Sequence, residues 1–328
     1  MQSYRTTGET NPTLTLVAAP DPVARANELL IDIKAASLNY RDLIVAQNNK
    51  GVLPLSDGAG VVSAIGAGVQ GFQIGERVVI GFMPGWIEGE FSAAKQATSL
   101  GGASVDGVLA QRIAVPANAV VRIPETMTFE EASALPCAGV TAWSALFERR
   151  PIQPGETVLL LGTGGVSIFA LQLAKLAGAR VIITSSSDEK LARARTLGAD
   201  HVVNYRTSPD WVSEVLDLTG GLGVDLAIDV AGPATLNDTL KATRHGGRIS
   251  LMGVLTGFAG PIDTGAILNK RITLQGIYVG SVAALRALCA TGIKPQVDEV
   301  FPFEKAEAAY ESLRAARHFG KLVIRVGT

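Results

Sequence analysis

Six short apolar runs between residues 156 and 280 alternate with segments of helical periodicity, and this alternation restricts the possible folds more than any other feature. The runs are ETVLLLG (156–162), ARVIITS (179–185), HVVNY (201–205), VDLAIDV (224–230), GRISLMG (247–253) and RITLQGIYVG (271–280). Helices are expected between them at 166–178, 188–198, 208–220, 233–246 and 265–270. Apolar strands separated by helices are typical of a parallel sheet covered on both faces. The pattern predicts a doubly wound nucleotide-binding domain.

The rest of the chain has a different pattern. From Thr13 to about Ile123, short β-like runs are broken by Gly, Pro and Asp, which indicates a β-rich domain. A helix is expected over 139–149, and we assign the helix and the strand of the tail to the β-rich domain. The sequence thus predicts an α/β protein with a β-rich domain over 1–124 and 295–328 and a nucleotide-binding domain over 125–294.

The composition narrows the possible classes of function. The chain has 328 residues, of which 47% are hydrophobic and 18% charged, so it can bury a large core. Lys and Arg number 29 against 30 Asp and Glu, and the resulting net charge of −1 argues against a nucleic-acid or membrane-surface partner. We therefore expect a small-molecule partner.

The number of cysteines and the hydropathy of the chain indicate the cellular compartment of the protein. Cys137 and Cys289 are too few for a disulfide framework or a Cys-rich zinc site. The sequence contains no run of eighteen apolar residues, and its start does not read as a signal peptide. These features predict a cytoplasmic protein without a membrane span.

A glycine cluster follows the first apolar run of the alternating region. Gly162, Gly164 and Gly165, followed by Val166, lie between the expected strand and helix, where a tight turn lets the backbone approach a pyrophosphate. The third glycine of the G-x-G-x-x-G spacing would fall at Ser167, so the motif is incomplete. Its place after the first of six strands nevertheless predicts a dinucleotide site.

The second expected strand ends without an acidic residue, in Thr-Ser-Ser-Ser. NAD enzymes present a carboxylate there to the ribose 2′-hydroxyl. Ser185, Ser186, Lys190 and Tyr205 could instead hold a 2′-phosphate, which predicts NADP(H). The alternative is a serine that caps the next helix, with Lys190 on a solvated face.

Several blocks resemble the medium-chain dehydrogenase/reductase superfamily, and particularly its zinc-free quinone oxidoreductase-like branch. The blocks are ASLNYRD (36–42), DGAGVVSAIGAGVQGFQIGERVV (57–79), ALPCAGVTAWSAL (134–146), LGTGGVS (161–167), LGADHVVNYR (197–206) and HFGKLVI (318–324). The resemblance implies an alcohol dehydrogenase-like fold: a GroES-like β-rich catalytic domain plus a Rossmann doubly wound parallel-sheet domain. It also implies a homodimer or a homotetramer.

The same resemblance indicates whether the chain has the ligands of a catalytic metal. The zinc enzymes of this superfamily carry Cys, His and Cys at the positions of Asn39, Ser56 and Cys137, so one of three ligands remains. Neither Asn nor Ser replaces a thiolate or an imidazole well. Arg41 stands where those enzymes have a proton-relay hydroxyl. We therefore expect no metal.

Without a metal, the favoured acceptors of hydride are quinones and α,β-unsaturated carbonyl compounds. We expect Tyr40 to donate a hydrogen bond to the developing oxyanion and Asn39 to position it. If the LNYRD segment is extended, Asn39 and Tyr40 face opposite sides. The alternative is a structural network in which Asp42 bonds backbone amides.

Further cofactor contacts are implied by the resemblance. Thr141 would contact the nicotinamide, the backbone around Gly253, Val254 and Val279 would hold its carboxamide, and Lys321 would point toward the cofactor. The alternatives are a helix-terminal hydrogen bond for Thr141 and a solvated strand start for Lys321. The long loop 83–107 is interpreted as a substrate lid or as the remnant of a lost zinc lobe.

The leading hypothesis is therefore an NADPH-dependent, zinc-independent oxidoreductase of quinones or enones. A zinc-type alcohol dehydrogenase and an enoyl-thioester reductase are the alternatives among enzymes. A non-catalytic, NADPH-binding regulatory protein is the alternative of another class, because a fold does not by itself determine a function.

Overall fold

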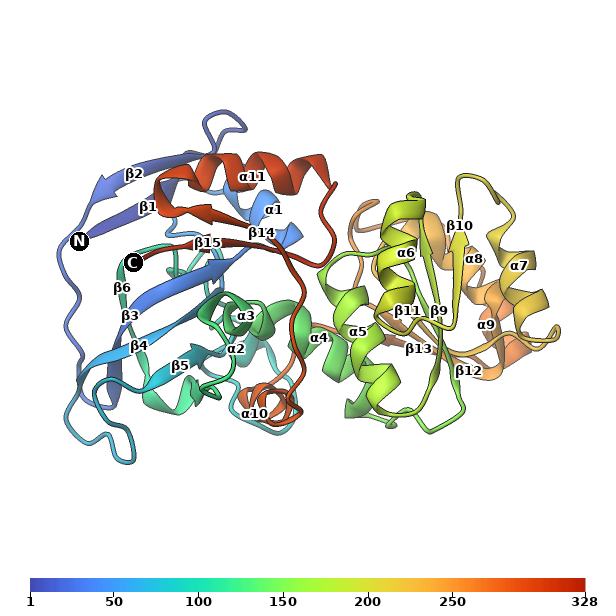
Figure 1. Ribbon diagram of the computed structural model, residues 1–328, viewed down its shortest axis with the longest axis horizontal. Helices are drawn as coiled ribbons and strands as arrows, with labels where there is room; N and C mark the ends of the chain where they lie inside the picture. The colour runs from blue at the N-terminus through green and yellow to red at the C-terminus, as the bar shows by residue number, and fades with distance from the viewer. Residues whose placement is uncertain (328) are drawn as a thin grey trace. The chain divides into compact units, whose positions relative to one another are not determined.

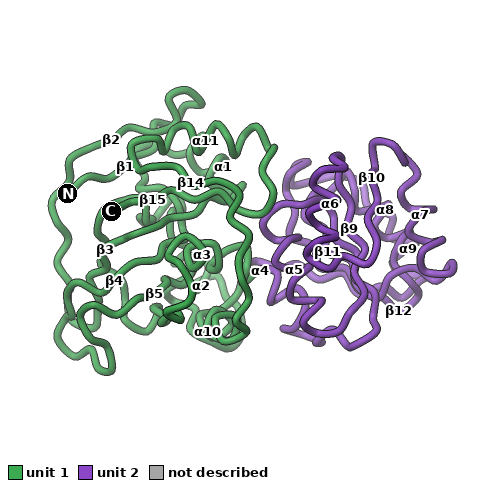
Figure 2. Tube along the Cα trace, in the orientation of Figure 1, with its two compact units in different colours: residues 1–140, 279–328 green, residues 141–278 purple. Residues whose placement is uncertain are grey.

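The computed structural model describes residues 1–327 and divides into two compact units (Figure 2). Unit 1 comprises Met1–Val140 and Val279–Thr328, and unit 2 comprises Thr141–Tyr278. The chain thus enters and leaves unit 2 once.

Unit 2 contains a six-stranded sheet in the order β10-β9-β8-β11-β12-β13, with every neighbouring pair parallel. The strands are β8 (Thr157–Leu160), β9 (Arg180–Ser185), β10 (His201–Asn204), β11 (Val224–Asp229), β12 (Thr243–Leu251) and β13 (Thr273–Gly276). The strand order reverses between β8 and β11, as in a doubly wound nucleotide-binding sheet. The predicted Rossmann domain is confirmed.

Helices cover both faces of this sheet. They are α5 (Gly165–Leu176), α6 (Asp188–Thr196), α7 (Trp211–Leu218), α8 (Pro233–Ala242) and α9 (Thr264–Lys270). Figure 1 shows α5 and α6 on the near face. Side chains of α7 and α8, including Val215, Leu236 and Leu240, share one core cluster with the strands. All four residues of β8 are buried, which explains why the strands read as continuous apolar runs.

One predicted helix in unit 2 ends earlier than expected. The segment 233–246 was expected to be helical throughout, but α8 stops at Ala242 and β12 begins at Thr243. Thr243 already has extended backbone angles, and Gly246 adopts a positive φ of 67° that a helix does not allow. The chain therefore leaves the helix at Thr243, before it reaches the glycines expected at the helix end.

Unit 1 is the β-rich, GroES-like domain. A sheet in the order β14-β15-β3-β4-β5-β7, with β6 paired to β3, forms its centre, and β1 and β2 form a separate hairpin. The strands are β1 (Gln2–Thr6), β2 (Leu14–Ala18), β3 (Glu28–Ser37), β4 (Asp57–Ile65), β5 (Arg77–Ile80), β6 (Arg112–Pro116), β7 (Val120–Arg122), β14 (Val297–Pro302) and β15 (Lys321–Arg325). β15 pairs with β3, so the tail belongs to this domain, as predicted.

The helices of unit 1 lie around this sheet. They are α1 (Tyr40–Asn48), α2 (Ala93–Gln96), α3 (Phe129–Ser133), α10 (Val282–Ala290) and α11 (Ala306–Ala315), with short turns η1 (Ala117–Ala119) and η4 (Phe303–Lys305). The expected helix over 139–149 is α4 (Val140–Trp143), which continues the π-helical turn η2 (Leu135–Gly139) and is followed by another, η3 (Ser144–Glu148). The boundary between the units falls within α4.

The structure divides the chain at different places from those we expected. Residues 125–140 and 279–294 were assigned to the nucleotide-binding domain, but they group with unit 1. The reason lies in α10, which packs against η2 and β7. The backbone amides of Val282 and Ala283 also donate to the carbonyls of Trp86 and Ile87, at 2.9 Å each. These contacts hold α10 in the β-rich domain.

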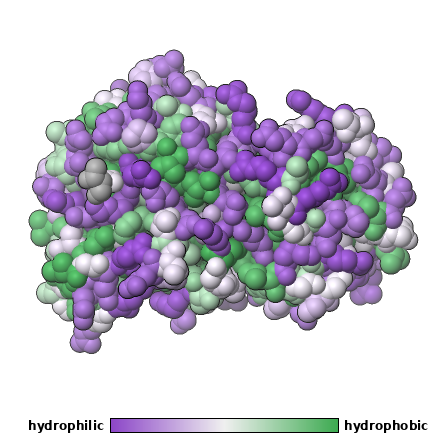
Figure 3. All heavy atoms as spheres, in the orientation of Figure 1, coloured by the Kyte–Doolittle hydropathy of each residue, from purple (hydrophilic) through white to green (hydrophobic). Residues whose placement is uncertain are grey.

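On the face of the molecule in Figure 3, small groups of apolar residues lie among polar residues, as the balanced composition leads us to expect. Within residues 1–327, no helix has the length and apolar character needed to cross a bilayer.

Candidate active site

The glycine cluster of unit 2 forms the turn between β8 and α5. Gly162 has a φ of 72°, and Gly164 is the N-cap of α5, so Gly165 and Val166 begin the helix. A Cβ on either Gly162 or Gly164 would have no atom of this chain within 4 Å. The turn therefore presents its backbone to open space, as a close approach by a pyrophosphate requires.

Ser167 occupies the position of the missing third glycine. It is 1% exposed, and its hydroxyl donates to the carbonyl of Leu161 at 2.7 Å. This small side chain ties the first turn of α5 to the end of β8. The departure from the glycine spacing thus leaves the strand-to-helix turn intact.

The residues expected around a 2′-phosphate lie at the carboxyl ends of β9 and β10. Ser185 ends β9 and pairs in register with Asn204 of β10, and the amide of Tyr205 donates to the Ser185 carbonyl at 3.1 Å. Ser186 follows directly and is partly exposed, and Tyr205 is 43% exposed. The structure brings these residues together at one edge of the sheet.

The helix-capping alternative is confirmed for the serine that caps the next helix. The Ser187 hydroxyl accepts from the amide of Lys190 at 3.4 Å and caps α6. Asp188, the first acidic residue after β9, accepts from Asn204 Nδ2 at 2.7 Å. Its carboxylate therefore already has a partner within the protein.

Gly253 and Val254 follow β12, at the same edge as the ends of β8 and β9. A Cβ on Gly253 would lie 2.0 Å from the backbone of Val230, so this glycine is required by packing. Asp229, at the end of β11, is fully buried and accepts from the amides of Ala231 and Gly232 at 3.0 and 2.9 Å. It orders the loop beside Gly253.

Thr141 is the first residue of unit 2, and Val279 is the first residue of the second segment of unit 1. Thr141 is 5% exposed and lies within α4, so it does not cap the start of a helix. Val279 has a φ of 55°, which is strained for a β-branched residue, and it is 8% exposed. Strain of this kind concentrates at functional sites.

The LNYRD segment of unit 1 is not extended. Asn39 is the N-cap of α1, and its backbone amide donates to Asp42 Oδ2 at 2.7 Å. The opposite faces expected of Asn39 and Tyr40 in an extended segment therefore do not apply, because the segment turns into a helix at this point. The prediction that Asp42 bonds a backbone amide is confirmed. Tyr40, the first residue of α1, is 40% exposed.

Lys321 is buried, not solvated. It is 3% exposed at the start of β15, and its Nζ donates to the Leu38 carbonyl and to Asn39 Oδ1, at 2.5 Å each. Its Nζ also lies 4.0 Å from Asp57 Oδ2. The alternative of a solvated strand start is wrong, because β15 pairs with β3 and so brings Lys321 beside the end of β3.

Asp57 is the centre of a buried network in unit 1. It is fully buried at the start of β4, and it accepts from the Ser56 hydroxyl at 2.7 Å and from the Cys137 amide at 3.1 Å. The Ser37 hydroxyl lies 3.4 Å from Asp57 Oδ2. Residues from three distant segments thus meet at one carboxylate.

Asp42 adds a second buried carboxylate. Burial raises its pKa from 3.8 to about 6, although the charge of Arg41 lowers it. Arg41 NH1 lies 3.5 Å from Asp42 Oδ1 and donates to the Leu100 carbonyl at 3.1 Å. Arg41 therefore ties α1 to the loop 83–107.

Two family models match the chain. An alcohol dehydrogenase GroES-like domain matches residues 25–125, and a zinc-binding dehydrogenase domain matches residues 165–292. A zinc-type alcohol dehydrogenase-like protein of Schizosaccharomyces pombe is 42% identical, over 91% of this chain and 91% of that protein. This chain belongs to the medium-chain dehydrogenase/reductase superfamily. It is an alcohol dehydrogenase-like oxidoreductase of that superfamily.

Solved structures of the superfamily share the whole fold. A putative alcohol dehydrogenase from Sinorhizobium meliloti has a TM-score of 0.92 and 40% identity, and covers 99% of this chain and 98% of its own. An NAD-dependent alcohol dehydrogenase has a TM-score of 0.89 and 34% identity over both full chains. A mycobacterial protein in complex with NADPH has a TM-score of 0.82 and 26% identity, over 99% and 100%.

The zinc that the matching family model implies does not fit the residues of this chain. Asn39 Oδ1 accepts from Lys321, the Ser56 hydroxyl donates to Asp57, and burial raises the pKa of the Cys137 thiol. Zinc sites are built from thiolate, imidazole or carboxylate ligands, which an amide and a hydroxyl replace poorly, and the ammonium of Lys321 would repel the ion. Within residues 1–327, no group of three His, Cys, Asp or Glu side chains could hold a metal ion.

The loop 83–107 is anchored within unit 1. Trp86 is 4% exposed, its Nε1 donates to the Gly89 carbonyl at 2.8 Å, and its ring lies 5.0 Å from that of Phe91. Lys95 Nζ donates to the carbonyls of Glu88 and Glu90 at 2.9 and 2.5 Å. These bonds give the loop its own internal structure, which neither the lid nor the remnant interpretation predicted.

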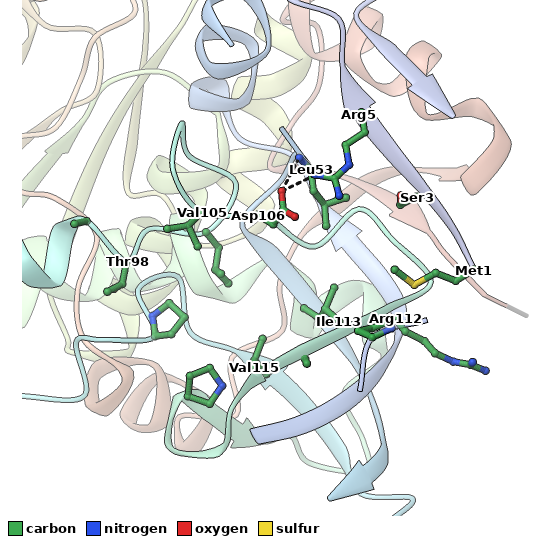
Figure 4. Close-up of a pocket in the computed structure, with 17 residues that line it drawn as sticks. Met1, Ser3, Arg5, Leu53, Thr98, Val105, Asp106, Arg112, Ile113 and Val115 are labelled. Atoms are coloured by element: carbon green, nitrogen blue, oxygen red, sulfur yellow. Dashed lines mark hydrogen bonds and ion pairs between the residues drawn. The ribbon is translucent and has the colours of Figure 1, made fainter. Parts of the chain in front are cut away.

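A pocket of about 490 Å³ lies elsewhere in unit 1 (Figure 4). Its lining is mostly apolar and includes Leu53, Val105, Ile113 and the ion pair between Arg5 and Asp106, at 2.6 Å. Part of the loop 83–107 lines it, but none of the predicted catalytic or cofactor-binding residues does. This pocket is therefore separate from the residues proposed for hydride transfer.

Sequence reasoning assigned no role to Asp57 as the centre of the network. The available signal is an acidic residue directly before the small and apolar run GAGVV, where a strand begins. An ionisable residue at a buried position usually has a charged or hydrogen-bonding partner. That rule points to a partner but does not identify Lys321, which lies 264 residues further along the chain.

Proposed function

We propose that this chain is an NADPH-dependent, zinc-independent oxidoreductase that transfers hydride to quinones or α,β-unsaturated carbonyl compounds, like the quinone oxidoreductase-like branch. The observation that carries the proposal is the hydrogen bond from the Lys321 ammonium to Asn39, at 2.5 Å. It places a buried cation at a position where the zinc enzymes have a ligand. Without a Lewis acid to ionise an alcohol, acceptors that form a delocalised anion are favoured.

The residues of unit 2 fit a nicotinamide dinucleotide. The open backbone at Gly164 and the N-terminus of α5 suit a pyrophosphate, and solved relatives include one that is NAD-dependent and one complexed with NADPH. Ser185, Ser186 and Lys190, with no acidic residue at the end of β9, support a preference for NADPH. When bound, the reduced cofactor supplies the hydride.

The chain itself supplies orientation and hydrogen bonds. Thr141, Gly253, Val254 and Val279 are proposed to orient the nicotinamide, as the resemblance implies. Tyr40 is proposed to donate to the acceptor oxygen that gains negative charge, while Asn39 is held in place by Lys321.

The deciding experiment follows NADPH absorbance with chelator-treated protein and a panel of quinones, enals, enoyl thioesters and simple aldehydes. Turnover of quinones or enals at an unchanged rate after chelation is expected. Activity that appears only with simple aldehydes and added zinc would show a zinc-type alcohol dehydrogenase. Turnover of enoyl thioesters alone would show an enoyl-thioester reductase. Cofactor binding without any turnover would show a regulatory protein.

A further inference from the structure

The pocket of about 490 Å³ in unit 1 is formed by segments of that unit alone. β1, the segment around Leu53, part of the loop 83–107 and β6 supply its walls. Figure 4 shows Leu53 on one side of it and Ile113 and Val115 of β6 on the other. Its volume lies within the range of about 300–1,000 Å³ that is typical of sites for small organic molecules. The pocket is therefore large enough for such a ligand and needs no part of unit 2.

Alternate side chains of β1 face the pocket. Ser3 and Arg5 line it. Tyr4, which lies between them, points into the core of unit 1, where its hydroxyl donates to the carbonyl of Phe303 at 2.9 Å. Successive side chains of a strand point to opposite faces. The side chain of Ser3 is therefore on the face of β1 that meets the pocket.

The hydroxyl of Ser3 is unsatisfied. Among residues 1–327 it has no hydrogen-bond partner, and Ser3 is 0% exposed. A buried hydroxyl without a partner is unfavourable, and most buried polar side chains in folded proteins have one. A hydroxyl can donate one hydrogen bond and accept others. A ligand with an oxygen atom at this end of the pocket would supply the missing partner.

Much of the remaining wall is apolar. Leu53, Leu100, Ile113 and Val115 line the pocket, and each is at most 7% exposed. Removing apolar surface from water is favourable, so walls of this kind bind a molecule that is itself largely apolar.

The charged side chains that line the pocket lie toward its mouth and are paired within the chain. Arg5 is 32% exposed and lies 2.6 Å from Asp106. Arg112 is 44% exposed, and it donates to Asp32 at 3.0 Å and to Asp21 at 3.2 Å. The charge of each arginine is thus balanced by a carboxylate of this chain, which favours a neutral ligand over a charged one.

We propose that this pocket is a ligand site that binds a neutral, largely apolar molecule, and that the Ser3 hydroxyl donates a hydrogen bond to a carbonyl or hydroxyl oxygen of that molecule. The site contains none of the residues proposed for catalysis or for the cofactor, so the proposal does not depend on the proposed function. It assigns a role to the one lining side chain whose polar atom is buried and unpartnered in the described chain.

The test compares three probes of similar shape in the absence of NADPH. α-Tetralone has two fused rings and one carbonyl oxygen, tetralin has the rings without the oxygen, and naphthoate carries a carboxylate. NMR spectra of the methyl-labelled protein report binding through the methyl groups of Ile113 and Val115. α-Tetralone is expected to shift these signals to saturation and to bind more tightly than tetralin or naphthoate.

Ser3→Ala isolates the hydrogen bond. The variant is expected to bind α-tetralone about tenfold more weakly, the change that the loss of one such bond produces, and to bind tetralin as the natural protein does. Ser63→Ala is the matched control, because Ser63 lies on β4 outside the pocket and its hydroxyl donates to the Leu30 carbonyl. It should leave the affinity for both probes unchanged.

Ala97→Trp locates the binding. Ala97 lines the pocket from an exposed position, so a larger side chain there fills the pocket without disturbing the core. This variant should bind none of the probes. Unchanged binding of α-tetralone to Ala97→Trp would place the probe elsewhere and overturn the proposal, as would the absence of any methyl shift in the natural protein.

Thermal unfolding without ligand tests the state of the hydroxyl itself. Ser3→Ala should unfold at the same temperature as the natural protein or slightly above it, because it removes a buried polar group that lacks a partner. A lower unfolding temperature would show that the hydroxyl is already bonded in the free protein. Either that result or an equal loss of affinity for α-tetralone and tetralin would overturn the role of Ser3.

Discussion

Asp42 is a carboxylate held out of water at the first turn of α1, where it is 1% exposed. Burial raises its pKa from 3.8 to about 6, so the folded protein keeps this proton at a pH where the unfolded chain releases it. Folding stability therefore decreases as the pH rises from about 4 to 6, and above that range the penalty is on the order of 3 kcal/mol. Below pH 4 both states are protonated, and the penalty disappears.

We predict that Asp42→Asn removes this penalty, because the amide oxygen can still accept from the Asn39 amide. The variant should unfold at a higher temperature than the natural protein at pH 7, and the two should converge near pH 4. Thermal unfolding followed by circular dichroism across that range measures the difference. An equal difference at pH 4 and pH 7 would contradict the prediction.

Tyr40 is placed for contact with solvent or a ligand, since 40% of it is exposed at the start of α1. If its hydroxyl donates to the acceptor oxygen, Tyr40→Phe should lower kcat for quinones by about 100-fold. The KM for NADPH should stay constant, because the phenyl ring is retained. Steady-state kinetics measure kcat for quinones and the KM for NADPH. An unchanged kcat would contradict the role of Tyr40 as a hydrogen-bond donor.

At the scale of elements, two glycines of unit 2 form a matched pair, one at the start of α5 and one at the end of β13. Gly164 and Gly276 both have open space at the Cβ position and negative φ, so alanine fits either position without strain. Gly164→Ala should weaken NADPH binding by about tenfold or more, because its methyl group would stand between the backbone and the pyrophosphate. Gly276→Ala should bind NADPH normally.

Fluorescence titration of NADPH measures both affinities, and the thermal unfolding temperature shows that both variants are folded. Equal affinities for the two variants would mean that the pyrophosphate does not lie against Gly164.

The end of β9 determines the choice of cofactor in our proposal. Ser186→Asp should weaken NADPH binding by about tenfold or more and affect NADH much less, because the new carboxylate repels a 2′-phosphate. Ser213→Asp adds the same charge to the exposed surface of α7 and is the control. Dissociation constants for both cofactors provide the measurement. Equal constants for NADH and NADPH in the natural protein would already contradict the preference.

Local sequence patterns were sufficient to predict some secondary-structure elements and not others. The apolar runs predicted all six strands of unit 2, and most clearly the central strands β8, β9 and β11, because strands buried on both faces contain little besides apolar residues. The LNYRD segment could not be assigned in the same way. Asn39 and Asp42 are spaced as in a helix cap, but the same residues are common in extended loops, and only the start of α1 settles the choice.

For the whole molecule, we propose the homodimer or homotetramer that the family resemblance implies. Large apolar side chains remain exposed on unit 2, including Phe258 at 78% and Leu268 at 76%. Exposed apolar groups of this size favour burial against another chain. Sedimentation equilibrium should give two or four times the chain mass of 34.1 kDa. A species of the single-chain mass at micromolar concentration would contradict the proposal.

The sequence by itself determined that there are two domains, where the six strands of unit 2 lie in the chain and the position of the glycine turn. Each of these depends on patterns within a few tens of residues, where periodicity and turn chemistry act directly. The tertiary structure decided that Lys321 is buried and bonded to Asn39, because the pairing of β15 with β3 joins residues 282 positions apart. It also decided that α10 belongs to unit 1, since that depends on packing against η2 and β7. Contacts between residues so far apart along the chain produce no periodic pattern in the sequence from which they could be predicted.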